Sequence, residues 1–240
     1  MNGNPSFIIH HSSFAIRHSS MLLAIHSLAE RAERIDQPFA LVLLGLIGDM
    51  GAHLYVAQGQ LDWHKHIDED EIFLVHEGSL RLETELGKAT LYPNEAMLIP
   101  KGVAHRSQSA LRSVVILFRQ QVLPQRKNGH RNYLVTDDSA PLVKARLSGF
   151  ANESSRPFEP AAVAMMEGHC LSAFLANGFG SSQTSPASGT LLYAIQGAVG
   201  IELDEGGARL EQGQLTILPP RTSYKLHAAQ PAMVVRFERE

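Results

Sequence analysis

The sequence predicts an all-β protein that contains two similar domains in tandem. Short runs rich in β-branched and aromatic residues are separated by Gly, Pro, Asn or Asp, a pattern typical of β-sandwiches and barrels. The series of runs also repeats without a gap. When the chain is shifted so that Gly59 falls on Gly178, Phe118 falls on Phe237. Turn positions thus match turn positions and core positions match core positions, which indicates a duplicated domain.

Six short strands are expected in the first copy, over residues 52–57, 72–75, 79–83, 89–92, 96–99 and 114–118. The apolar run over 39–47 precedes them and is too short to span a membrane, so we interpret it as a buried strand. The first domain is therefore expected at residues 39–123 and the second at 161–240, joined by a polar linker over 124–160.

The N-terminal region differs from the repeated part. Apolar residues recur at intervals of three and four over 21–38, which predicts one amphipathic helix that ends near Pro38. Residues 1–20 contain a near-duplicate unit, and we interpret them as a disordered or spuriously translated extension, with Met21 as the start of the protein. The alternative is a histidine-rich, metal-binding tail formed by His10, His11 and His18.

The composition argues against several classes of partner. The chain has 240 residues, a formal net charge of -3 and a pI near 6.5, so it lacks the basic footprint of proteins that bind nucleic acid or anionic membranes. The single cysteine, Cys170, rules out an internal disulfide and suits a reducing cytoplasm. We therefore expect a cytoplasmic protein whose partners are small molecules rather than nucleic acids or membranes.

Four residues of the first copy are candidate metal ligands. His64 and His66 are two positions apart, so on a strand both imidazoles point from the same face, about 6.6 Å apart along the chain. Glu71 opens the next apolar strand, and His105 follows a Pro-x-Gly turn. Three imidazoles and one carboxylate suit one divalent metal ion such as Fe, Mn, Ni, Zn or Cu. Glu69 and Asp70 are alternative carboxylate ligands, but Glu71 is preferred because it directly precedes the apolar strand, and residues 68–70 are expected to form a solvated turn.

The second copy lacks all four candidates. The shift pairs His64 with Gln183, His66 with Ser185, Glu71 with Thr190 and His105 with Tyr224. Their joint absence indicates that the four residues form one unit in the first copy. We expect the second copy to keep the scaffold as packing surface without the metal site. The alternative is a small polar ligand held by the four replacement side chains.

The spacing of the candidate ligands resembles the two sequence motifs of the cupin superfamily. The first motif, Gly-x5-His-x-His-x3or4-Glu-x6-Gly, is similar to the segment from Gly59 to Gly78, in which the leading glycine stands one residue closer to the histidines. The second motif, Gly-x5-Pro-x-Gly-x2-His-x3-Asn, is similar to residues 94–109. There Asn94, which tolerates positive φ, replaces the first glycine, and Ser109 replaces the final asparagine.

The resemblance implies two jelly-roll β-barrels in tandem, a bicupin, with barrels similar to those of mannose-6-phosphate isomerase and quercetin dioxygenase. It also implies that the first barrel binds one divalent metal ion through His64, His66, Glu71 and His105, with positions left open for water, dioxygen or substrate. The reaction stays open, because cupins include dioxygenases, isomerases, decarboxylases, sensory domains and storage proteins. Barrels of this superfamily commonly pair through sheet edges, so a homodimer is also expected.

Two kinds of function follow from the resemblance. The leading hypothesis is a metal-dependent enzyme, a dioxygenase or an isomerase, that acts on an oxygen-rich small molecule and uses Glu71 as a catalytic base. The alternative is a non-catalytic or sensory module that binds metal or a small molecule. Around the site, Trp63 is expected to be buried and His76 to point away from the metal. The side chains expected to line the barrel are Phe73, Val75, Leu80, Leu82, Met97 and Ile99.

Overall fold

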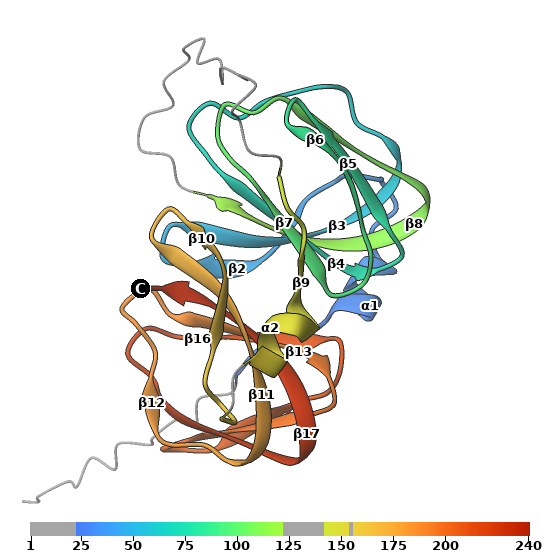
Figure 1. Ribbon diagram of the computed structural model, residues 1–240. Coiled ribbons are helices and arrows are strands. Elements are labelled where there is room, and N and C mark those ends of the chain that lie inside the picture. Colours follow the sequence, from blue (N-terminus) through green and yellow to red (C-terminus); the bar gives the residue numbers. More distant parts are fainter. Residues whose placement is uncertain (1–22, 122–141, 154–155) are drawn as a thin grey trace, which may run out of the picture.

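The computed structural model describes residues 23–121, 142–153 and 156–240, which form two antiparallel β-sheets and two short helices (Figure 1). The helices are α1 (Leu28–Ala32) and α2 (Leu147–Glu153). The first sheet contains β2 (Val42–Ile47), β3 (Met50–Gln60), β4 (Glu71–Glu77), β5 (Leu80–Thr84), β6 (Gly87–Leu91), β7 (Glu95–Ile99), β8 (His105–Gln120) and β9 (Ala145–Arg146). The second contains β1 (Ile25–Ser27), β10 (Ala161–Met166), β11 (His169–Phe179), β12 (Gln183–Thr184), β13 (Thr190–Gln196), β14 (Val199–Leu203), β15 (Gly207–Leu210), β16 (Gln214–Leu218) and β17 (Ser223–Arg239).

The duplication predicted from the sequence is visible in the strands themselves. Under the shift that places Gly59 on Gly178, β2 coincides residue for residue with β10, β3 with β11, β4 with β13, β5 with β14 and β7 with β16. Backbone conformation repeats as well. Asn94 has a φ of 64° and its equivalent, Gly213, a φ of 83°. Asparagine is one of the few residues that adopt this left-handed conformation readily, so it can replace glycine at the turn.

Each half closes into a barrel because its last strand is long enough to pair with strands on both sides of that barrel. The C-terminal part of β8 pairs with β3 and β4, whereas its first residues pair with β5. Strand β17 pairs in the same way with β11, β13 and β14. This folding of a sheet onto itself gives the jelly-roll form. The prediction of an all-β protein with two jelly-roll barrels in tandem and a short N-terminal helix is therefore confirmed.

Alternation along β4 separates the interior of the first barrel from its outer face. Phe73 and Val75 point inward, where they belong to one apolar cluster with the other predicted lining residues, Leu80, Leu82, Met97 and Ile99. Ile72 and Leu74 point to the opposite face and belong to a second cluster, to which both barrels contribute. A third cluster fills the interior of the second barrel.

The two barrels are joined through the shared cluster rather than by the connecting chain alone. Phe118 and Phe237, which occupy equivalent positions in the two copies, pack against each other with ring centroids 4.5 Å apart and ring planes tilted by 36°. Close by, His76 turns away from the interior of its own barrel, as expected, and its Nδ1 lies 2.7 Å from the hydroxyl of Tyr193. The upper and lower halves of Figure 1 therefore pack face to face.

The N-terminal helix is shorter than the sequence predicts. A helix was expected over 21–38, but α1 has five residues, with Ser27 as its N-cap. The residues just before it form β1, which pairs with β16 of the second barrel. A short helix gains little free energy from its own hydrogen bonds, whereas a sheet edge offers backbone groups that need partners. The predicted extension over 1–20 lies outside the described residues.

Two other segments differ in detail from the expectation. The expected linker over 124–160 contains β9, which pairs with β7 of the first barrel, and α2, which packs on β10 and β11 of the second. The run expected as a buried strand forms β2, but Leu43 and Leu46 are 43% and 44% exposed, because β2 lies at a sheet edge. Among the described residues, no helix is long and apolar enough to cross a membrane.

Candidate metal centre

The structure brings the four residues predicted as ligands together. Glu71 is the first residue of β4 and His105 the first of β8, whereas His64 and His66 lie in the loop between β3 and β4 rather than on a regular strand. A bridge ties the loop to β8, in which His64 N–H donates to the His105 carbonyl (3.0 Å) and His105 N–H donates to the His64 carbonyl (2.8 Å). Gly102 N–H also donates to the His66 carbonyl (2.7 Å). One ligand atom from each side chain lies within 4.8 Å of the other three.

Hydrogen bonds fix which ring nitrogen faces the cluster. His64 Nδ1 lies 2.8 Å from the carbonyl oxygen of Asp62, and His105 Nδ1 lies 3.1 Å from that of Val103. A carbonyl oxygen can only accept, so both rings carry a proton on Nδ1, and in the neutral tautomer Nε2 is the unprotonated nitrogen that faces the cluster. Burial lowers the pKa of His64 below its ordinary value, which favours the neutral ring that metals bind.

Two buried atoms at the centre of the cluster lack a hydrogen-bond partner among the described residues. They are Glu71 Oε2 and His105 Nε2, which lie 3.2 Å apart, and His66 Nε2 is 3.4 Å from the same carboxylate oxygen. A carboxylate and an imidazole lone pair repel each other unless a proton or a cation lies between them. Donor atoms about 2.1 Å from a shared ion lie about 3 to 4 Å apart. The residues present therefore fit a divalent metal ion.

Glu69 and Arg119 form a second layer around the ligands. From the sequence, Glu69 was considered only as an alternative ligand and Arg119 was not considered. Glu69 was expected in a solvated turn, but it is 3% exposed. Its carboxylate accepts hydrogen bonds from Arg119 and lies 3.1 Å from His66 Nδ1. Arg119 Nη1 in turn lies 3.6 Å from Glu71 Oε1. A carboxylate on Nδ1 turns Nε2 of His66 toward the cluster, as outer carboxylates do for metal-bound histidines.

Both carboxylates of the site stay ionised. Burial alone would raise the pKa of Glu69, but the hydrogen bond from His66 and the charge of Arg119 hold it below its ordinary value. For Glu71, burial is likewise outweighed by the neighbouring His105, His66 and Arg119, so its pKa is also lowered. The site thus concentrates negative charge where the imidazole lone pairs converge, as a cation site requires.

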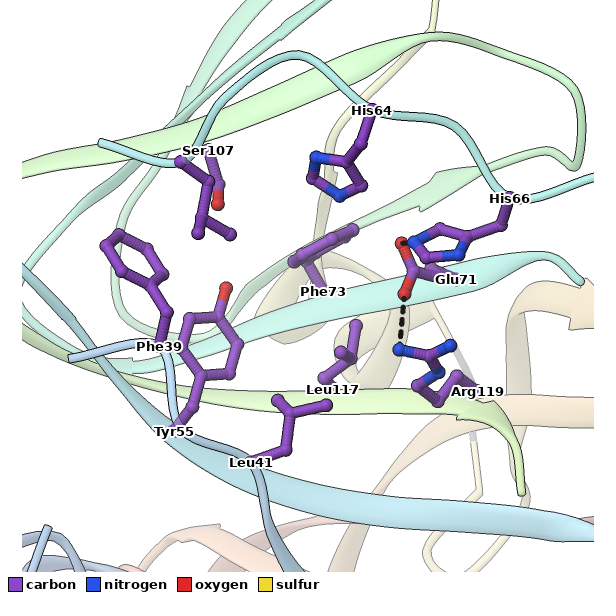
Figure 2. Close-up of a pocket in the computed structure, with 11 residues that line it drawn as sticks. Phe39, Leu41, Tyr55, His64, His66, Glu71, Phe73, Ser107, Leu117 and Arg119 are labelled. Atoms are coloured by element: carbon purple, nitrogen blue, oxygen red, sulfur yellow. Dashed lines mark ion pairs between the residues drawn. The ribbon is translucent and has the colours of Figure 1, made fainter. Parts of the chain in front are cut away.

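A cavity of about 120 Å3 lies beside the cluster inside the first barrel. Figure 2 shows His64, His66, Glu71 and Arg119 at one end, and the hydroxyl groups of Tyr55 and Ser107 at the other. Between the two ends the walls are apolar, formed by Phe39, Leu41, Leu61, Phe73 and Leu117. A mostly apolar cavity with a few convergent polar groups is the common form of a small-molecule site.

The equivalent positions of the second barrel carry side chains that bond within the protein. Tyr224 Oη donates to Gln183 Oε1 at 3.0 Å, and Arg236 Nη1 donates to the same oxygen at 3.3 Å. Thr190 and Ser185 also donate to acceptors inside the barrel, at 2.7 and 2.6 Å. All four replacement side chains are thus engaged in internal hydrogen bonds.

Two residues next to the ligands lie outside the cavity. Trp63, which was expected to be buried, is 48% exposed, because its neighbour His64 and the bridge to β8 turn it toward solvent. The guanidinium of Arg106 lies 5.3 Å from the centre of its ring. Arg106 also pairs with Glu83, Nη2 to Oε2 at 2.7 Å. Neither residue lines the cavity beside the cluster.

One family model matches the first barrel across the ligand residues, and known sequences match part of the chain. The family described as Homogentisate 1,2-dioxygenase N-terminal matches residues 45–116, a range that contains all four ligands. The uncharacterized protein YdbB of Bacillus subtilis is 37% identical over 84 residues, which cover 35% of this chain and 74% of YdbB. A homogentisate 1,2-dioxygenase of Rhodopseudomonas palustris is 42% identical over 59 residues, which cover 24% of this chain and 13% of the enzyme.

Solved structures match almost the whole of the described chain. A cupin 2 conserved barrel domain protein from Leptotrichia buccalis superposes with a TM-score of 0.69 and 8% identity, over 92% of this chain and 98% of its own. The chain therefore has the cupin fold. It also resembles a salicylate 1,2-dioxygenase from Pseudaminobacter salicylatoxidans, with a TM-score of 0.69 and 11% identity over 92% and 85% of the two chains. Such identities establish the fold, so the reaction has to be argued from the site.

Proposed function

We propose that this cupin is a metal-dependent enzyme that acts on an oxygen-rich small molecule in the first barrel, with dioxygenation as the leading reaction. The observation that carries the proposal is the convergence of imidazole nitrogens and one carboxylate oxygen at the end of a cavity of small-molecule size. The match to a homogentisate dioxygenase supports the choice of reaction, although it covers a small part of that enzyme.

Each residue of the site has a task in this proposal. The metal ligands are His64, His66, Glu71 and His105. A divalent metal held by four protein ligands can polarise dioxygen or a substrate oxygen at its open positions. Arg119 faces Glu71 Oε1 and so leaves Oε2 for the cluster. Glu71 therefore serves as a ligand rather than as a free base. The apolar walls keep water away from the bound substrate.

Metal content is the first test of the proposal. Protein purified without a histidine tag should contain about one divalent ion per chain, measured by elemental analysis. The double variant His64→Ala, His66→Ala should lose this ion. The matched control replaces the equivalent residues of the second barrel, Gln183→Ala with Ser185→Ala, and should keep it. Unchanged metal content in the histidine variant would contradict the ligand assignment.

Turnover is the second test. The metal-loaded protein is incubated with catechols, diketones, flavonols, hydroxybenzoates and uronates while oxygen uptake and product formation are followed. A dioxygenase consumes oxygen in step with product. Product formation without oxygen uptake would mean that the reaction is an isomerisation and not a dioxygenation. Metal-dependent ligand binding without any product would instead favour a binding or sensory module.

A further inference from the structure

The duplication extends to the strands that cross between the barrels. Strand β1 precedes the first barrel but pairs with β16 of the second, and β9 precedes the second barrel but pairs with β7 of the first. Under the shift that places Gly59 on Gly178, β9 coincides with the last two residues of β1 and β7 with β16. The two sides of the interface between the barrels can therefore be compared residue by residue.

A cavity of about 160 Å3 lies on the side of the interface formed by β7, β9 and β10 (Figure 1). All the described side chains that line it are apolar. They include Ile72 and Ala96 of the shared apolar cluster, and Leu98, Val163 and Ala164, which pack against that cluster. The cavity therefore continues the interface, and it shares no described lining residue with the cavity beside the metal ligands.

Small side chains account for the space on this side. Ala96 of β7 pairs with Ala145 of β9, and both line the cavity. The equivalent pair on the other side is Leu215 of β16 and His26 of β1, which are 0% and 8% exposed. A leucine and an imidazole thus occupy the positions that hold two methyl groups beside the cavity. Protein interiors are otherwise closely packed, so the two alanines leave the space open.

The facing barrel adds to the difference. On the other side Gly45 of β2 lets Ile217 approach so closely that a Cβ added to Gly45 would clash with the Ile217 side chain. The equivalent residues beside the cavity are Ala164 and Leu98. Because Ala164 has a Cβ, Leu98 cannot fill the space by an equally close approach.

The size and lining of the cavity restrict the ligand that it can take. An apolar cavity of about 150 Å3 is known to stay dry and to bind benzene or xenon, and this one has about 160 Å3. Its described side chains offer no partner to a charged or strongly polar group. Val143, which lines the cavity, is 79% exposed, so the cavity reaches the surface and a ligand can enter.

We propose that this cavity is a second ligand site, which takes a small apolar molecule of about the size of one six-membered ring, such as a monocyclic aromatic hydrocarbon. Atoms around an unfilled apolar cavity lack dispersion contacts, so a bound ring would complete the packing between the barrels. The site lies behind the strand that carries Glu71 but uses none of the metal ligands. The inference is therefore independent of the proposed function.

Calorimetric titration with benzene and toluene tests this, with pyridazine as a ring of similar shape that carries two polar nitrogens. We expect about one benzene per chain, bound at least about tenfold more tightly than pyridazine. Ala96→Leu, which introduces the residue of the equivalent position, should weaken benzene binding at least about tenfold, and Ala164→Leu should do the same. Ala162→Leu, at an exposed position of β10, is the matched control and should bind benzene as the unaltered protein does.

Thermal unfolding provides a second measurement. Benzene at about five times its Kd should raise the Tm of the unaltered protein by about 2 to 4 °C, but not that of Ala96→Leu. Absence of benzene and toluene binding, equal affinity for pyridazine, or binding that survives both filling variants would overturn the inference. The metal-site variant His64→Ala, His66→Ala should bind benzene normally whatever its metal content. Loss of benzene binding there would place the ligand at the metal centre and overturn the inference as well.

Discussion

At the scale of single residues, Glu69 acts on the site without belonging to the ligand set. Its carboxylate engages both His66 and Arg119, so one side chain orients an imidazole and holds the guanidinium that faces Glu71. We expect Glu69→Gln to weaken metal binding by about tenfold to a hundredfold, measured by competition with a chromophoric chelator. Glu77→Gln, at the exposed end of β4, is the control. Equal affinities in the two variants would show that the outer carboxylate has no orienting role.

The sequence reveals the ligands but not the residues that support them. His64 and His66 are close in the chain, and their spacing to Glu71 is short, so the pattern is local. Arg119 reaches the site because β8 pairs with β4 in a register that sets it opposite Glu71. Tyr55 reaches it from β3 across the barrel. Strand register and barrel closure are tertiary properties, and no spacing along the chain encodes them.

At the scale of elements, the turn between β4 and β5 needs glycine for two reasons. Gly78 has a φ of +81°, and a Cβ added there would lie 2.9 Å from the Cα of Ser113. Gly59 has a similar φ of +89° but nothing within 4 Å of such a Cβ. We expect Gly78→Ala to lower the free energy of unfolding by about 3 kcal/mol, as strain and clash add, and Gly59→Ala by about 1 kcal/mol. Urea unfolding measures both, and equal losses would mean that Ser113 moves aside freely.

The turns also explain why strands were predicted well and the N-terminal helix was not. Glycine or asparagine at positive φ indicates the end of a strand from the local sequence. Because the domain is duplicated, each such turn residue occurs at two equivalent positions, as with Asn94 and Gly213. The helix over 21–38 was inferred from periodicity alone. Within this range Ile25–Ser27 instead form β1, whose partner β16 begins at Gln214. Pairing with a strand so far away in the sequence cannot be predicted from the local pattern of apolar residues.

At the scale of the whole molecule, the second barrel covers an apolar face that the first barrel would otherwise expose. Ile72 and Leu74 of β4, on the reverse side of the strand that carries Glu71, belong to the cluster shared with the second barrel. The contact of Phe118 with Phe237 joins equivalent positions, as in the interface of a symmetric dimer. The outer face of the strand that carries Glu71 thus packs against the second barrel. We therefore expect the two barrels to unfold cooperatively.

The variant Phe237→Ala tests this cooperativity. The ring is fully buried in the shared cluster, and its removal should lower the free energy of unfolding by about 3 to 5 kcal/mol. Trp63, the single tryptophan, reports on the first barrel, whereas far-ultraviolet circular dichroism reports on both. We expect both urea transitions to shift together to lower concentration. Phe179→Ala, at a ring that is 86% exposed, should shift neither. The contrary result is a dichroism curve that splits into two transitions while the Trp63 fluorescence transition stays at the same urea concentration. The barrels would then be independent folding units, and the second copy would not support the metal site.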